Sequence, residues 1–365
     1  MFKSTFNPSG VRSIDFVLEK DAVTFLKKGW QSHVTSIPEY PKDNFIGKGI
    51  VISAGGIKYF TCAWILIKNL RTIGCNLPIE LWHLGPEISD EIIEELKELD
   101  VLCRDFLGIA HNNLTGVMLK PLAIVHSSFK EILFLDADNN CINDPSYLFE
   151  SKEYLDTGAI FWPDYWTTAK DNPIWKIVDS TDYNQQEQES GQILIDKERC
   201  WKEINLCLYF NIKHEVYHKM LYGDKDTFKF AWIALKSKYH MIERPVSTCG
   251  YLDFNHRFRG NTMVQHDPCG DLLFLHRNLL KWDITKIGEK VWQVIRTFNN
   301  SKTTNLIKFD SYSLDLEGDY HESLVPNSVE HLESKCLVFL KELRGSSFYC
   351  RYFIQSYILN SRGNL

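Results

Sequence analysis

The chain has 365 residues, of which 44% are hydrophobic and 24% are charged, and its formal net charge is −6. These proportions are ordinary for a compact globular protein and exclude a fibrous or intrinsically disordered chain. Because the basic residues form no stripe, nucleic acid is not an expected partner. The 10 cysteines include no Cys-x-x-Cys pair, so they predict neither a zinc ribbon nor a dithiol redox motif.

No targeting or membrane segment is predicted. The first residues lack the apolar core of a signal peptide. The longest apolar run, residues 60–67, is far shorter than the roughly 20 residues that span a bilayer. Free thiols in a reducing compartment therefore fit best, and a cytoplasmic location is favoured. The Golgi lumen is the alternative if a membrane anchor has been removed. The sequence does not predict an oligomeric state.

Three regions follow one another along the chain. Residues 1–46 are predicted as a mostly helical extension, which ends near Pro38 and Pro41 because two closely spaced prolines break a helix. Residues 47–283 are predicted as the catalytic domain. Residues 284–365 form a C-terminal extension that is polar at first and helical from about residue 329.

Strands and helices alternate in the first part of the predicted domain. A strand from residue 49 ends at the small residues Ser53, Ala54 and Gly55, and a helix over 59–73 follows. A strand over 79–84, a helix over 89–99 capped by Ser89, and a strand over 101–106 come next. A helix over about 115–129, with Pro121 inside it, precedes a buried strand over 131–135. This order predicts an α/β fold with a mostly parallel sheet and helices on both faces.

The alternation loosens after residue 138. Strands are predicted over 158–162 and 192–195, and helices over 200–212 and 225–236. The second half of the domain is therefore expected to be mixed rather than doubly wound.

Asp136 and Asp138 come directly after the buried strand. In an open parallel sheet, ligands bind beyond the carboxyl ends of the strands. On extended backbone, residues two apart point the same way, so the two carboxylates converge while Ala137 turns back towards the protein. Carboxylate oxygens suit Mn²⁺ or Mg²⁺, which would stabilise the charge on a departing nucleoside diphosphate. A polar loop that merely begins with Asp-x-Asp is the alternative.

His276 ends a second apolar run, and Lys281 follows it. Imidazole is a ligand for Mn²⁺-like ions, and an ammonium group pairs with diphosphate. The turn at Ser53, Ala54 and Gly55 lets a nucleotide approach the backbone closely, because glycine has no Cβ. Lys120 is a further candidate phosphate contact. Each of these residues also has an ordinary structural interpretation.

Two acidic clusters remain. The first contains Glu189 and Gln192 before a predicted strand, and the second contains Asp224 and Asp226 before a predicted helix. Asp224 or Asp226 is a candidate to cap that helix. In the functional interpretation Asp226, Glu189 or Gln192 faces the anomeric carbon or an acceptor hydroxyl. The rings of residues 162–166 are candidates to stack on a sugar, with core packing as their alternative use.

These motifs together resemble the GT-A-fold alpha-mannosyltransferases typified by fungal Golgi enzymes. The resemblance covers roughly residues 48–283 and rests on several segments in the same order: residues 120–123, 127–139, 144–145, 189–192, 223–228 and the region of His276. It implies a retaining transfer of a hexose from a nucleotide sugar to a glycan or glycoconjugate hydroxyl, with mannose from GDP-mannose as the favoured donor.

The resemblance also implies roles for individual residues. Asp136, Asp138 and His276 are expected to bind the metal. Glu189, Gln192, Asp224 and Asp226 are expected in the cleft where transfer occurs. The expected donor contacts are Ser53, Ala54, Gly55, Lys120, Asp136, Ala137 and Lys281.

Three other functions stay open at this stage. A UDP-sugar carrying galactose, glucose or N-acetylglucosamine would be bound by the same kind of site. A sugar-nucleotide pyrophosphorylase is less well matched, because the turn after the first strand lacks arginine. A non-catalytic module that binds sugar or a protein partner is the remaining alternative.

Overall fold

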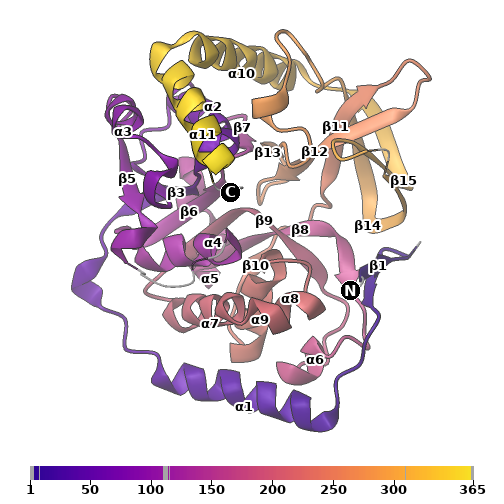
Figure 1. The fold of residues 1–365 in the computed structure, drawn as a ribbon. Helices are drawn as coiled ribbons and strands as arrows, with labels where there is room; N and C mark the ends of the chain where they lie inside the picture. The colour runs from indigo at the N-terminus through magenta and orange to yellow at the C-terminus, as the bar shows by residue number, and fades with distance from the viewer. Residues whose placement is uncertain (1–3, 8, 110–113, 115, 309, 363–365) are drawn as a thin grey trace.

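The computed structural model describes residues 4–7, 9–109, 114, 116–308 and 310–362, which form two β-sheets flanked by helices (Figure 1). The larger sheet has the strand order β1-β2-β8-β9-β6-β3-β4-β5, and β10 pairs with β8. Its strands are β1 (Ser4–Phe6), β2 (Val11–Ile14), β3 (Lys48–Ser53), β4 (Ile79–His83), β5 (Val101–Asp105), β6 (Glu131–Asp136), β8 (Ala159–Thr168), β9 (Gln186–Asp196) and β10 (His240–Met241).

The larger sheet is parallel where the sequence alternates regularly. β5, β4, β3 and β6 run parallel to one another. β9 is antiparallel to both of its neighbours, β6 and β8. The predicted α/β fold, with a mostly parallel sheet and a mixed second half, is confirmed.

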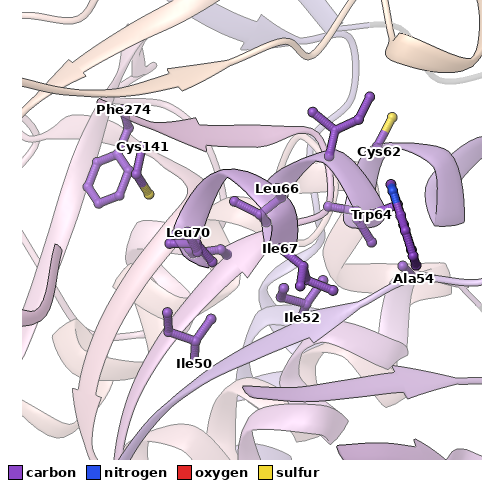
Figure 2. Packing of buried hydrophobic residues seen from close by; sticks show 14 of the residues in the cluster. Ile50, Ile52, Ala54, Cys62, Trp64, Leu66, Ile67, Leu70, Cys141 and Phe274 are labelled. Carbon is purple, nitrogen blue, oxygen red and sulfur yellow. The ribbon is translucent and has the colours of Figure 1, made fainter. Parts of the chain in front are cut away.

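Helices cover both faces of this sheet, as the alternation of apolar residues along β3 requires. Ile50 and Ile52 pack in the cluster that includes α2, whereas Val51 packs in the opposite cluster. Figure 2 shows Leu66, Ile67 and other α2 side chains lying over β3. The first face carries α2 (Gly56–Thr72), α3 (Asp90–Lys97), α5 (Lys152–Thr157), α10 (Asn327–Gly345) and α11 (Ser347–Arg362). The second carries α1 (Lys20–Ser36), α4 (Gly116–His126), α6 (Ile174–Ile177), α7 (Trp201–Ile212), α8 (His214–Met220) and α9 (Lys225–Leu235).

A second sheet, which the sequence did not predict, begins directly after Asp138. Its strand order is β11-β14-β15-β12-β13-β7. The turn at Asp136, Ala137 and Asp138 therefore connects the two sheets. The strands are β7 (Asn139–Cys141), β11 (Ser247–Leu252), β12 (Phe258–His266), β13 (Leu272–His276), β14 (Val294–Lys308) and β15 (Leu314–Leu324).

Both terminal regions contain strands that the predictions missed. Residues 1–46 include the long helix α1, but β1 and β2 lie in the same region, and β2 pairs in parallel with β8. The C-terminal helix expected from about residue 329 is α10, which begins at Asn327. Before it, β14 and β15 form an antiparallel hairpin. Many side chains of β15 are exposed. The sequence of this strand is therefore polar, and the segment was predicted as polar rather than as a strand. The expected domain boundaries stay predictions.

Several predicted elements differ in extent. α2 begins at Gly56 rather than at residue 59. α4 spans Gly116–His126, and Thr115, where the helix was expected to start, lies outside the described residues. β9 begins at Gln186, so Glu189 and Gln192 lie inside this strand rather than before it. In the described part of the chain, no helix has the length and apolar character needed to cross a membrane.

Candidate active site at the junction of the two sheets

Strand register brings the predicted site residues together. Asp136 lies opposite Ser53 in the parallel pair of β6 and β3. After the turn, Asn139 of β7 lies opposite His276 of β13, and the backbone N–H of Arg277 donates to the Asp138 carbonyl oxygen over 2.9 Å. His276, far away in the sequence, is therefore held beside the aspartates by the ladder of the second sheet.

The three predicted metal ligands converge on one point. His276 Nε2 lies 3.2 Å from Asp138 Oδ1 and 3.8 Å from Asp136 Oδ2. The other ring nitrogen, Nδ1, lies 3.0 Å from Glu189 Oε1. One ligand atom each from Asp136, Glu189 and His276 also falls within 4.8 Å of the others. Because Glu189 bonds the nitrogen that faces away from the aspartates, it fits best as the carboxylate that orients the imidazole.

The charges in this cluster favour a bound cation. Burial alone would lower the pKa of His276, but the Asp138 and Glu189 carboxylates raise it to about 10. Burial raises the pKa of Asp136 despite the neighbouring Lys120 ammonium. Burial would also raise the pKa of Asp138, yet His276 and Lys281 hold that pKa below its ordinary value. The carboxylates of Asp136, Asp138, Glu189 and Asp224 thus face the cationic Lys120, Lys281 and His276, and a divalent ion bound here would replace the proton of the His276 imidazole.

Two partly buried lysines lie beside the aspartates. Lys120 Nζ lies 3.0 Å from Asp136 and 3.3 Å from Asp224 Oδ2, and it donates to the Ser190 hydroxyl over 2.8 Å. Lys281 forms an ion pair with Asp138. Burial alone would lower the pKa of Lys120, but the two aspartates near it raise that pKa above its ordinary value. Both ammonium groups therefore stay charged and are suited to phosphate oxygens.

Two cavities meet at this cluster. One, of about 500 Å³, is named here the Gly55 cavity. The other, of about 400 Å³, is named the Trp166 cavity. The described residues that line both are Lys120, Asp136, Asp224, His276 and Asn278. All the expected donor contacts line the Gly55 cavity: Ser53, Ala54, Gly55, Lys120, Asp136, Ala137 and Lys281.

The four residues expected in the transfer cleft divide into two pairs. Glu189 lines the Trp166 cavity, and Asp224 lines both cavities. Although Asp224 stands at the start of α9, its side chain does not cap the helix and turns to Lys120 instead. Burial alone would raise the pKa of Glu189, but His276 and Lys120 hold it below its ordinary value. Asp224 is therefore placed to act on a bound ligand, whereas the oxygens of Glu189 are bonded to His276, the Gly191 N–H and Gln192.

Gln192 and Asp226 line neither cavity, so the geometry corrects the expectation that they face a reacting sugar. Gln192 is fully buried; its Nε2 donates to Glu189 over 2.6 Å and its Oε1 accepts from Asn139 over 2.8 Å. Asp226 is fully buried and forms ion pairs with Lys225 and Lys229. Each side chain satisfies its own polar atoms inside the fold, which a sequence pattern does not reveal.

Some residues of the Gly55 cavity were missed by the sequence analysis. Glu87 packs so closely on Gly55 that a Cβ there would lie 2.0 Å from Glu87 Oε2. Burial raises the pKa of Glu87. Tyr59 lies at the start of α2 with Lys281 Nζ 5.5 Å from its ring centre, and Asn278 follows β13. None belongs to a motif. Glu87 and Asn278 lie between strands, where no periodic signal exists, and nothing in the sequence distinguishes Tyr59 from the other residues of α2.

The family-model comparison matches residues 47–189 and 180–267 to the family described as "Mannosyltransferase putative". Together these segments cover more than half of the chain, so the protein belongs to this family. The resemblance drawn from the site motifs is thereby confirmed.

Individual relatives come from fungi. The alpha-1,2-mannosyltransferase MNN23 of Candida albicans is 27% identical over 70% of this chain and 52% of its own length. MNN21 of the same organism is 29% identical over 75% and 50%, and Saccharomyces cerevisiae MNN5 is 28% identical over 61% and 49%. The chain thus spans about half the length of these relatives.

Solved structures that align with part of the chain include two glycosyltransferases. The Streptococcus pneumoniae glycosyltransferase GlyE aligns at a TM-score of 0.38 and 17% identity, over 54% of this chain and 46% of its own. The mannosyltransferase Ktr4p of Saccharomyces cerevisiae aligns at 0.34 and 14%, over 60% and 76%. The fold described above is defined by the strand pairings within this chain and not by these alignments.

Proposed function

We propose that this chain is a metal-dependent glycosyltransferase that moves a hexose, mannose from GDP-mannose first among the candidates, to a glycan hydroxyl with retention of configuration. One observation carries the proposal: Asp136, Asp138 and His276 Nε2 converge where two cavities meet. A transferase needs a donor site and an acceptor site that adjoin each other, and two cavities that meet at one cluster provide this arrangement. Membership of the mannosyltransferase family supports the same function.

The residues at the border suit the departure of a nucleoside diphosphate. Mn²⁺ or Mg²⁺ held by Asp136, Asp138 and His276 would neutralise the diphosphate. Lys120 and Lys281 add fixed positive charges beside the same oxygens. In the proposed reaction the bond from sugar C1 to the diphosphate oxygen breaks. A bond from C1 to the acceptor oxygen forms on the same face, and the hydroxyl proton passes to the leaving diphosphate.

The Gly55 cavity suits the nucleoside. Gly55 lets Glu87 approach the cavity wall, where its carboxyl would accept from ribose hydroxyls or from the N–H groups of guanine. The Tyr59 ring, 44% exposed, offers a face for stacking on a base. A guanine donor is therefore favoured over uracil, whose edge offers fewer N–H groups. The expected cytoplasmic location stays a prediction.

The test measures release of nucleoside diphosphate from a panel of GDP- and UDP-sugars with Mn²⁺, with and without oligosaccharide acceptors. We expect the fastest release with GDP-mannose and a product whose anomeric proton shows retained configuration by NMR. Asp136→Asn and Asp138→Asn should each lower the rate at least about 100-fold, because each removes a charge that stabilises the leaving group. Glu330→Gln, on an exposed helix face, serves as the control.

The outcomes separate the alternatives. Faster release from a UDP-sugar would overturn the donor assignment and keep the transferase. No release from any donor, with sugar binding retained, would favour a non-catalytic binding module. Full activity of the two aspartate variants with unchanged Mn²⁺ dependence would overturn the metal site.

A further inference from the structure

The Trp166 cavity is closed on one side by residues from the two ends of the chain. Phe6 comes from β1, and Asp310, Ser313, Leu314 and Leu316 come from the segment that joins β14 to β15 and from β15 itself. These residues are named here the outer wall. All of them lie outside residues 47–267, the part of the chain that matches the family model. The matched segment supplies Lys120, Asp136 and Asp224 of the border with the Gly55 cavity, whereas His276 and Asn278 of that border and the whole outer wall lie outside the match.

A separate hydrophobic cluster fixes the outer wall in place. Its buried members include Trp166, Met263 and Leu316, and Phe6 packs against it. The Phe6 ring lies 4.5 Å from the Trp166 ring, and Leu314 pairs with Gly260 in the second sheet. Burial of such side chains stabilises the contact by roughly 1.5 to 3 kcal/mol each. The outer wall is thus a packed surface.

The rings of this cavity suit a sugar ring. Phe6 and Tyr222 meet edge to face with 5.5 Å between their ring centres, and the Tyr222 side chain is 54% exposed. Aromatic rings bind the C–H faces of a sugar ring while leaving its hydroxyl groups free to hydrogen bond. The lining also contains carboxylates that would accept hydrogen bonds from those hydroxyls: Asp136, Asp164, Glu189, Asp224 and Asp310.

The charge of the cavity disfavours an anionic sugar. Its lysines, Lys120 and Lys225, are already engaged: Lys225 Nζ lies 3.0 Å from Asp164 and 2.7 Å from Asp226. Asp310 accepts from the Tyr312 N–H and the Ser313 hydroxyl. A phosphate or carboxylate on the acceptor would therefore meet like charge, which costs binding free energy.

We propose that the outer wall determines acceptor selectivity: Phe6 stacks on a neutral acceptor sugar, and Asp310 excludes acceptors that carry a negative charge near the reacting hydroxyl. This inference rests on the proposed transferase function and adds to it the residues that choose the acceptor. The inference also assigns acceptor selection to the outer wall, whose segments lie outside the residues matched to the family model.

The experiment compares a neutral hexoside acceptor with its 6-phosphate derivative at saturating donor. For the wild-type protein, kcat/KM should be at least about tenfold higher with the neutral acceptor than with the 6-phosphate. Asp310→Lys should lower this ratio of kcat/KM values about fivefold, because it removes a charge that repels the phosphate. Phe6→Ala and, separately, Tyr222→Ala should raise the acceptor KM about twofold to tenfold, the range of aromatic contacts. Phe254→Ala, an exposed ring outside both cavities, is the matched control.

The comparison between the change in acceptor KM and the change in donor KM decides the result. A rise in acceptor KM that exceeds any change in donor KM supports the outer wall as the selective surface. Equal changes in both, or an unchanged preference in Asp310→Lys, would overturn it. If the wild-type protein transfers nothing, the proposed function fails, and binding of the neutral hexoside followed by tryptophan fluorescence tests the wall alone. Weaker binding of the hexoside by Phe6→Ala than by the wild-type protein would then support the outer wall, and equal binding by both proteins, or no binding by the wild-type protein, would refute it.

Discussion

Glu333 of α10 offers a direct test of how the C-terminal helices support the site. Its carboxylate lies 3.5 Å from Arg277 Nη1, and both side chains are fully buried. The same carboxylate accepts from the backbone N–H groups of Val291 and Trp292. Arg277 in turn donates to Thr285 Oγ1 over 2.8 Å and so fixes the loop between β13 and the short helix η5 (Trp282–Ile284).

Replacing Glu333 with alanine should be strongly destabilising. Removal of one partner from a buried ion pair costs about 3 to 5 kcal/mol, because the remaining charge is left buried without compensation. The two N–H groups that lose their acceptor add to this cost. A loss of about 4 kcal/mol corresponds to a fall of roughly 5 °C in the thermal midpoint for a chain of this length.

Two measurements follow from this geometry. The midpoint of thermal unfolding is followed by the fluorescence of Trp282 and Trp292, which flank Arg277. Mn²⁺ affinity is measured by calorimetry, because the same loop carries Lys281, the partner of Asp138.

The control and the refuting result come from the same helix. Glu330→Ala removes a carboxylate that is 59% exposed and pairs with Lys290 at the surface. This control should change the unfolding free energy by less than about 1 kcal/mol. If Glu333→Ala unfolded no earlier than Glu330→Ala, the buried pair would not stabilise the fold.

Three further predictions concern the site and the second sheet. Lys120→Met should lower kcat/KM about 100-fold by removing a fixed charge beside the leaving group, measured as release of nucleoside diphosphate. Gly191→Ala should weaken Mn²⁺ binding about 10- to 100-fold in calorimetry, because the added Cβ would lie 2.4 Å from His276 Nδ1, whereas Gly108→Ala meets nothing within 4 Å. Burial lowers the pKa of His266 from 6.5 to about 4. Between pH 6.5 and pH 4 the imidazole is therefore protonated in the unfolded chain but not in the folded one, so the free energy of unfolding falls as the pH drops through this range. The loss is about 3 kcal/mol, and denaturant titrations of His266→Leu should lack this slope.

The parallel half of the sheet and the place of the two aspartates were predictable because each depends on short-range pattern. A buried strand followed by Asp136 and Asp138 fixes where the carboxylates lie, since parallel strands carry ligands at their carboxyl ends. His276 was predictable as the end of an apolar run. The family resemblance implied that His276 is a metal ligand together with the aspartates. The pairing of β13 with β7, which brings His276 to them, is not specified by any local pattern.

The residues that were misplaced share a different property. Gln192 and Asp226 are polar and stand in clusters, which favoured a catalytic interpretation, yet both are buried with their hydrogen-bonding atoms satisfied. A sequence shows that a polar residue is present and does not show whether the fold supplies it with partners. The strands β1, β14 and β15 were missed for a different reason. Each pairs with a strand next to it in the sequence, but β1 has only three residues and β15 is largely exposed, so neither shows the apolar pattern of a buried strand.

The position of Asp138 explains why the site needs both sheets and the C-terminal helices. Asp136 ends a strand of the larger sheet, whereas Asp138 is held by the Arg277 N–H in the second sheet. The loop that follows Arg277 is held in turn by Arg344 of α10, which donates to the Thr285 carbonyl oxygen over 2.7 Å. The distance between the two carboxylates therefore depends on how the second sheet sits against the first. Any change that loosens α10 is expected to reach the proposed metal site through this loop, although α10 contributes no side chain to either described lining.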